Sequence, residues 1–178
     1  RLAGKNVSAG SVPFFVGCGA YKHHVPASVD HLIQRSEFLT SYTPYQPEIS
    51  QGTLQGIFEF QTLIARLLGM EVANASMYDG ATALAEGALM ACRLTKRSAV
   101  AVSQALHPHY RTVLDTYCNA NGIEVRDLTM TEEGGTSLEH LKDDTELAAL
   151  IVQSPNVFGV VEHLAEQAEW IHARKGLL

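Results

Sequence analysis

Residues 99–128 read AVAVSQALHPHYRTVLDTYCNANGIEVRDL, and this stretch decides the predicted fold. It begins with a short apolar run, 99–103, that is typical of a buried strand. Apolar positions then recur at helical spacing over 109–121, and Gly122 is expected to close this helix. A second strand is predicted over 123–128. A strand, a helix and a strand in this order imply a right-handed crossover between two parallel strands.

The same alternation continues on both sides of this stretch. Toward the C-terminus we expect a short helix over 138–142, a strand over 147–153 and a helix over 163–175. Toward the N-terminus, small apolar residues at helical spacing predict an alanine-rich helix from Ala81 to Cys92. This order predicts an α/β fold in three layers, with helices on both faces of a mostly parallel sheet.

The N-terminal part of the chain is predicted to be irregular and helical. Its strongest pattern is an amphipathic helix whose apolar positions are Leu54, Ile57, Phe58, Ile64 and Leu68. Ser50 is expected to cap this helix and Gly69 to end it. We therefore divide the chain into residues 1–70, an arm with a loop and this first long helix, and residues 71–178, part of a large α/β domain. The two parts are expected to form a single structural unit.

Composition excludes several classes of function. The chain has 178 residues, of which 46% are hydrophobic and 18% are charged, as in an ordinary globular domain. Its formal net charge of -6 provides no basic surface for nucleic acid or for an anionic membrane. The apolar runs are far shorter than a membrane span requires.

The three cysteines, Cys18, Cys92 and Cys118, are odd in number and far apart. This spacing matches neither a disulfide framework nor a zinc site, so we expect no metal and a reducing, cytoplasmic location. Cys118 lies on one face of a predicted helix, which favours a place in the core over a reactive role.

Both ends of the sequence suggest truncation. There is no initiator methionine, and Gly176-Leu177-Leu178 stops where a new apolar strand is expected. Separately, no charged segment followed by an apolar one opens the chain, so a signal peptide is not expected. The alternative is a mature chain that ends in a frayed helix. A sheet with exposed edges tends to pair, so self-association is expected.

Residues 41–52, SYTPYQPEISQG, precede the long helix and carry two prolines spaced by three. The prolines remove backbone donors and disfavour helix for the residue before each, so the segment is predicted to be a stiff loop. Tyr42, Tyr45, Gln46 and Glu48 are candidates to line a channel or an interface. A packed interface loop is an equal alternative, because aromatic residues are frequent in both settings.

The turn over 74–82 is a second candidate site because it leads into a helix. The first turn of a helix offers free N–H groups and the positive end of the helix dipole, which suit an anion. Asp79 stands where it can cap this helix itself, immediately before Gly80 and Ala81. Its carboxylate would repel a phosphate, so capping is favoured over ligand binding.

Two further loops follow predicted strands, where α/β proteins place ligands. His107-Pro108-His109 has the spacing of two metal ligands but lacks a third, so a histidine that stacks on a ring or starts the next helix is favoured. Residues 154–159, SPNVFG, form a turn by default. Ser76 lacks the surroundings of a hydrolase nucleophile.

Four segments resemble the P-protein of the glycine cleavage system, glycine dehydrogenase (decarboxylating), most closely the subunit 1, N-terminal-type half. The resemblance is strongest over residues 41–86, SYTPYQPEISQGTLQGIFEFQTLIARLLGMEVANASMYDGATALAE. It extends to residues 14–38, 101–114 and 152–162, and so to essentially the whole chain. His163 departs from the family pattern, which has an acidic residue there.

The resemblance implies a fold-type-I pyridoxal-phosphate-dependent transferase-like large domain, present in part. In this family the enzyme decarboxylates glycine with pyridoxal phosphate and passes the aminomethyl group to the lipoyl arm of the H-protein. In two-subunit versions the cofactor lysine belongs to subunit 2, and the two subunits form a heterotetramer. The resemblance therefore implies that this chain supports the active site of the partner subunit and holds no covalent cofactor.

The resemblance also assigns positions. Asp79, Gly80 and Ala81 correspond to the turn that holds the cofactor phosphate in other members of the fold, and His107 to the residue that stacks over the cofactor ring. In this chain both are interpreted as remnants. Lys96, Lys142 and Lys175 fall in helical contexts outside any Schiff-base motif.

The residues by themselves are also compatible with two other classes of protein. One is a free-standing pyridoxal-phosphate transferase of the aminotransferase or desulfurase type, which needs a lysine bound to the cofactor. The other is a non-catalytic module in which the 41–52 loop binds a protein partner.

Overall fold

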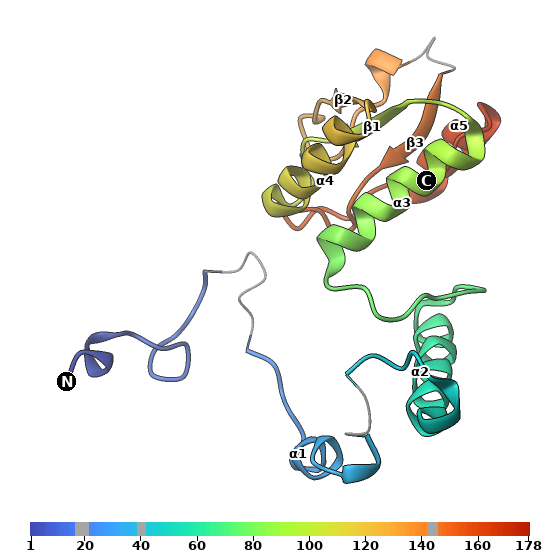
Figure 1. The fold of residues 1–178 in the computed structure, drawn as a ribbon. Coiled ribbons are helices and arrows are strands. Elements are labelled where there is room, and N and C mark those ends of the chain that lie inside the picture. Colours follow the sequence, from blue (N-terminus) through green and yellow to red (C-terminus); the bar gives the residue numbers. More distant parts are fainter. Residues whose placement is uncertain (17–21, 39–41, 142–145) are drawn as a thin grey trace. The chain divides into compact units, whose positions relative to one another are not determined.

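Helices and strands follow the predicted alternation in the computed structural model, which describes residues 1–16, 22–38, 42–141 and 146–178 (Figure 1). Ser41, Cys18 and Lys142 lie outside these residues. The chain divides into two compact units, Arg1–Ser76 and Met77–Leu178.

The first unit contains two α-helices within its described residues, α1 (Ala27–Ile33) and α2 (Gln51–Leu68). Gly69 ends α2 in the left-handed conformation, with φ of 66°, as predicted. Ser50 precedes α2 and is buried, but its side chain makes no capping hydrogen bond, so the predicted cap is wrong. Instead the Ser50 carbonyl accepts the Leu54 N–H at 3.0 Å and begins the helical hydrogen bonding.

The second unit alternates helices and strands along its whole length. In chain order its elements are α3 (Gly80–Thr95), β1 (Ala99–Ser103), α4 (Pro108–Ala120), β2 (Glu124–Leu128), β3 (Leu147–Ile151) and α5 (Leu164–Ala173). The predicted helix at 138–142 is a single 3-10 turn, Glu139–Leu141, as far as the described residues extend. The predicted α/β class is confirmed.

The three strands form a parallel sheet in the order β2-β1-β3. Ala99 of β1 lies opposite Glu124 on one side and Leu147 on the other. After α5 the chain returns to β3, where the Leu177 N–H donates to the Ala148 carbonyl at 3.0 Å. The carboxyl ends of all three strands therefore share one edge of the sheet.

Successive side chains of β1 point to opposite faces of the sheet, and each face has its own core. Val100 and Val102 pack with buried residues of α3 and α4, such as Ala85 and Leu114. Ala99 and Ala101 pack on the other face with Ile171 of α5. Helices thus cover both faces, which is the predicted three-layer arrangement.

Candidate functional site

Asp79 caps α3 through a reciprocal set of hydrogen bonds. Its Oδ1 accepts from the Thr82 backbone N–H at 2.8 Å and from the Thr82 hydroxyl at 2.9 Å, while the Asp79 N–H donates to Thr82 Oγ1 at 3.3 Å. These bonds to Thr82 lower the pKa of the Asp79 carboxyl below its ordinary value. The predicted cap is present, and an ionised carboxylate occupies the anion-binding end of the helix.

Gly80 and Ala81 continue this first turn against α4. A Cβ atom at Gly80 would lie 2.2 Å from the hydroxyl oxygen of Tyr110, so only glycine allows this approach. Ala81 is buried. Tyr110, which the sequence analysis did not single out, thus fills the space beside the start of α3.

His107 is held at the start of α4 by two hydrogen bonds. Its Nδ1 accepts from the His109 N–H at 3.2 Å, and its own N–H donates to Oε1 of Gln153 at 3.0 Å. The His107 ring centroid lies 5.1 Å from that of His109 and 5.3 Å from that of Tyr110. His107 therefore starts a helix and contacts aromatic rings, the alternative that the sequence favoured over a metal site. Among the described residues, no group of three or more His, Cys, Asp or Glu side chains is placed to hold a metal ion.

A buried carboxylate, Glu162, joins the loops that follow the strands. Its Oε1 accepts from the Thr136 hydroxyl and from Nδ2 of Asn156, both at 2.9 Å. Its Oε2 accepts from the Thr136 N–H and from Nε2 of Gln167, both at 3.0 Å. Thr136 in turn contacts Ser103 Oγ at the end of β1, at 2.7 Å. Through Thr136, Glu162 thus links the end of β1 to the loops after β2 and β3.

The environment of Glu162 keeps it ionised. Burial raises the pKa of its carboxyl, but the hydrogen bonds from Thr136, Asn156 and Gln167 together outweigh burial and lower that pKa below its usual value. Sequence reasoning placed Asn156 in a turn, where its Oδ1 indeed accepts the N–H groups of Phe158 and Val160. It missed Glu162 and Thr136, whose only signal was their place after predicted strands, and Gln167, which lies within the predicted helix over 163–175.

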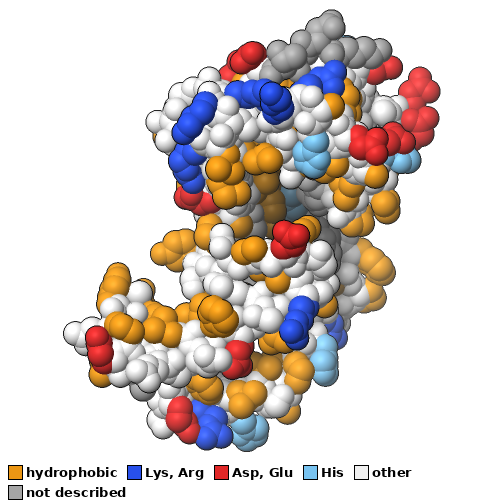
Figure 2. Space-filling model, turned by 90° about the vertical axis from the view of Figure 1, so that its right-hand side faces the viewer, with side chains coloured by type: hydrophobic (Ala, Val, Ile, Leu, Met, Phe, Trp, Pro, Cys, Tyr) orange, Lys and Arg blue, Asp and Glu red, His pale blue; other side chains and the backbone are white. Residues whose placement is uncertain are grey.

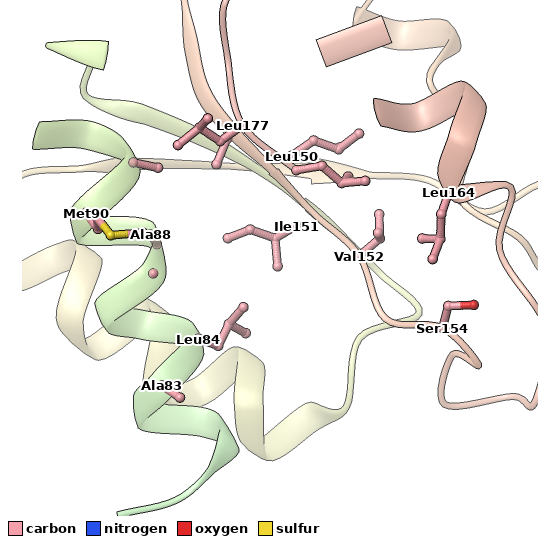
Figure 3. Close-up of a pocket in the computed structure, with 14 residues that line it drawn as sticks. Ala83, Leu84, Ala88, Met90, Leu150, Ile151, Val152, Ser154, Leu164 and Leu177 are labelled. Carbon is pink, nitrogen blue, oxygen red and sulfur yellow. The ribbon is translucent and has the colours of Figure 1, made fainter. Parts of the chain in front are cut away.

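Two cavities of different character adjoin the sheet. The first, of about 470 Å³, is apolar and lies between α3 and β3, with Leu84 and Met90 on the helix side and Ile151 on the strand side (Figure 3). The second, of about 740 Å³, lies beside the Glu162 network and is rich in acidic side chains. A smaller cavity of about 290 Å³ lies along α2 in the first unit.

The candidates of the 42–48 loop lie at the surface of the first unit. The side chains of Tyr42, Tyr45, Gln46 and Glu48 are exposed, and none lines the three cavities described above. Backbone hydrogen bonds hold the segment, with the Tyr45 N–H donating to the Thr43 carbonyl at 2.8 Å. Their role in a channel or an interface stays a prediction.

The described lysines and Cys118 lie in opposite surroundings. The lysines there, Lys5, Lys22, Lys96 and Lys175, are all exposed at the surface. Cys118 is fully buried in the core, as predicted, and burial raises the pKa of its thiol to about 11. None of the described helices combines the length and the apolar composition needed to cross a bilayer.

Comparison with known proteins decides the family. The glycine cleavage system P-protein family profile matches residues 1–178. The chain belongs to this family. A relative from Xanthobacter autotrophicus, "Probable glycine dehydrogenase (decarboxylating) subunit 1", is 59% identical over 178 residues, which is 100% of this chain and 40% of that protein. The protein of the same description from Phenylobacterium zucineum is 56% identical and is covered to 40% of its length.

A solved structure agrees with this membership in the P-protein family. The crystal structure of glycine decarboxylase (P-protein) of the glycine cleavage system, in inhibitor-bound form, matches with a TM-score of 0.89 and 51% identity over 99% of this chain. The match covers 39% of that chain. The present chain thus spans about 40% of the length of the P-proteins that it resembles. The predicted family and its pyridoxal-phosphate-dependent fold are confirmed.

Proposed function

We propose that this chain is part of a glycine dehydrogenase (decarboxylating) subunit 1 that shapes the active site of a partner subunit. The assembled enzyme would decarboxylate glycine with pyridoxal phosphate and transfer the aminomethyl group to the lipoyl arm of the H-protein. Its partners would be subunit 2, in a heterotetramer, and the H-protein. The free thiols of Cys92 and Cys118 support a cytoplasmic setting.

The capped start of α3 is the observation that supports assigning the cofactor to the partner subunit. Family membership implies pyridoxal phosphate, but the residues present here do not fit it. The Asp79 carboxylate already accepts the N–H and the hydroxyl of Thr82 at the start of α3, and its negative charge would repel a phosphate. The described lysines, moreover, lie exposed and line none of the three cavities. The cofactor is therefore assigned to the partner subunit, and Asp79, Gly80, Ala81 and His107 to vestigial positions.

The surface of the first unit supports a role in assembly. Of its described residues only Ser50 and Ala65 are buried, whereas large apolar side chains such as Phe58, Leu63 and Leu67 are more than half exposed. Hydrophobic side chains are visible across the face shown in Figure 2. Exposed large apolar side chains that gather on a surface are typical of protein–protein contact sites. We assign this surface to contact with subunit 2.

Cofactor trapping distinguishes this proposal from a free-standing transferase. The purified chain would be incubated with pyridoxal phosphate, reduced with borohydride and analysed by mass spectrometry. After excess cofactor is removed before reduction, we expect no lysine of this chain to be labelled stoichiometrically, and one such lysine on subunit 2 when the assembled enzyme is treated in the same way. A stable cofactor adduct on a lysine of this chain alone would favour the transferase.

The 42–48 loop is proposed to border the glycine or lipoyl channel of the assembly. Its test uses Tyr45→Phe and Glu48→Gln in the assembled enzyme, with Glu86→Gln, an exposed residue of α3, as the control. Both loop variants should lower the rate of CO₂ release from labelled glycine, and the heterotetramer should elute unchanged. If both loop variants release CO₂ at the rate of the Glu86→Gln control, the loop does not border the channel.

A co-purification experiment distinguishes this enzyme role from a non-catalytic binding module. The enzyme role predicts that the chain co-purifies with subunit 2, whereas a binding module could be recovered with the H-protein alone.

A further inference from the structure

The start of α3 carries three backbone N–H groups, those of Gly80, Ala81 and Thr82, that precede the first hydrogen bond of the helix. That first bond runs from the Ala83 N–H to the Asp79 carbonyl at 3.0 Å. N–H groups at a helix start, together with the positive end of the helix dipole, attract anions. What this turn can bind therefore depends on the side chains that already occupy it.

Asp79 occupies the turn with the protein's own negative charge. Its Oδ1 accepts from the N–H and from the hydroxyl of Thr82, so both donors of that residue are turned toward this carboxylate. These two bonds, and in smaller measure the Ala81 N–H, lower the pKa of the Asp79 carboxyl. Because the carboxylate is ionised at neutral pH, a second anion at this helix start would meet a like charge at short range.

Tyr110 covers the flank of the same turn. A Cβ atom at Gly80 would lie 2.2 Å from the Tyr110 hydroxyl oxygen and 2.9 Å from the ring carbon that bears it, so the phenol rests directly against the Gly80 backbone. The ring packs against the buried core of the second unit, and its centroid lies 5.3 Å from that of the His107 ring. The space beside Gly80 is thus filled by a side chain with packed neighbours of its own.

We propose that Asp79 and Tyr110 together close the start of α3 to phosphate, and that Tyr110 is a specificity-determining residue of this subunit. Asp79 acts through its charge and through its bonds to Thr82. Tyr110 acts through the space that it fills beside Gly80. This closure rests on the proposed function, which assigns the cofactor to the partner subunit, and it names the two side chains that exclude the cofactor phosphate from this chain.

The probe is inorganic phosphate, titrated into the full ¹⁵N-labelled chain at neutral pH, with sodium chloride adjusted to keep the ionic strength constant. Binding is followed by the shifts of the Gly80, Ala81 and Thr82 backbone amides. We expect no saturable shift of these amides in the unaltered chain. A saturable response there would overturn the proposal.

Two substitutions should open the turn only when they are combined, because charge and space are separate obstacles. Asp79→Ser removes the charge and keeps a favourable cap residue for α3. Tyr110→Leu removes the phenol and keeps an apolar side chain for the core. The double variant should bind phosphate saturably and at least about tenfold more tightly than Asp79→Ser alone. Equal affinities of these two variants would show that Tyr110 has no part in the closure.

Glu86→Gln is the matched control, because it removes one negative charge from an exposed position of the same helix and leaves Asp79 and Tyr110 in place. It should respond like the unaltered chain. A double variant that responds no more than this control would overturn the proposal. If Tyr110→Leu fails to fold, Tyr110→Phe replaces it, since this change removes only the hydroxyl that lies nearest to Gly80. Combined with Asp79→Ser, it should still bind more tightly than Asp79→Ser alone.

The phosphate titration and the cofactor trapping fail in different ways. Phosphate binding by the unaltered chain would refute the closure, yet the cofactor would stay assigned to subunit 2 if only that subunit is labelled. A stoichiometric cofactor adduct on a lysine of this chain would refute that assignment, whatever the phosphate titration shows.

Discussion

The two units of this chain use their hydrophobic residues in opposite ways. In Met77–Leu178, side chains from both faces of the sheet are removed from water, as with Leu114, which is 0% exposed. In Arg1–Ser76, α2 has an amphipathic sequence, yet Leu68 on its predicted apolar face is 64% exposed. Burial of apolar surface is the main favourable term in folding. The second unit therefore buries a core of its own, whereas the first unit leaves apolar surface exposed, and this is the surface that we propose to contact subunit 2.

Matched leucines give the sharpest test of this difference. Leu114→Ala in α4 should lower the free energy of unfolding by about 2–5 kcal/mol, because it leaves a cavity in a packed core. Leu63→Ala in α2 should change it by no more than about 0.5 kcal/mol in the isolated chain, because that side chain is exposed. Urea unfolding followed by circular dichroism measures both. Equal losses of unfolding free energy in the two variants would show that the two units do not differ in how they bury apolar side chains.

Two glycines of α3 test how tightly the second unit is packed. Gly80→Ala places a methyl group on the Tyr110 hydroxyl and should destabilise the chain by about 1–3 kcal/mol. Gly87→Ala, with nothing within 4 Å, should stabilise it by up to about 1 kcal/mol, because alanine favours helix. Thermal unfolding of the two variants gives the comparison. A neutral Gly80→Ala would show that Tyr110 moves aside at no cost.

The buried Glu162 predicts a pH dependence that belongs to the second unit. Its folded pKa lies below the ordinary value of 4.5, so its contribution is fully present above that pH and is lost as the pH falls through the folded pKa. Glu162→Gln should cost about 1–3 kcal/mol at neutral pH. The difference from the unaltered chain should shrink in acid. A difference that is constant from pH 7 to pH 3 would contradict the ionised, hydrogen-bonded carboxylate.

The smallest effect is expected from an exposed carboxylate of the first unit. The hydrogen bond from Arg35 lowers the pKa of Glu37 to about 2. Arg35→Gln should therefore raise the pKa of Glu37 toward 4.5 in an NMR titration. Unfolding should be unchanged within error, because an exposed ion pair contributes little. A clear loss of stability would mean that the first unit is more tightly ordered than its exposure indicates.

Local patterns predicted most of the second unit but not its polar network. The run Ala99–Ser103 and the cap at Asp79 depend on neighbours in sequence, so spacing alone located them. The contact between Gly80 and Tyr110 and the bond between Thr136 and Glu162 join residues far apart in sequence, and only the packed fold brings them together. At Ser50 the local pattern predicted a feature that the structure lacks: serine is a favourable cap residue, but its side chain makes no capping hydrogen bond. The family could be predicted from the sequence alone, because long motifs carry the resemblance.

Hydrogen exchange tests the central claim that the first unit completes its packing on a partner. Amide protection of α2 and α3 would be measured in the chain alone and after addition of glycine dehydrogenase subunit 2. We predict that α2 exchanges fast in the chain alone and becomes strongly protected on addition, whereas the core of α3 is protected in both states. Protection of α2 that stays unchanged when subunit 2 is bound would contradict the account.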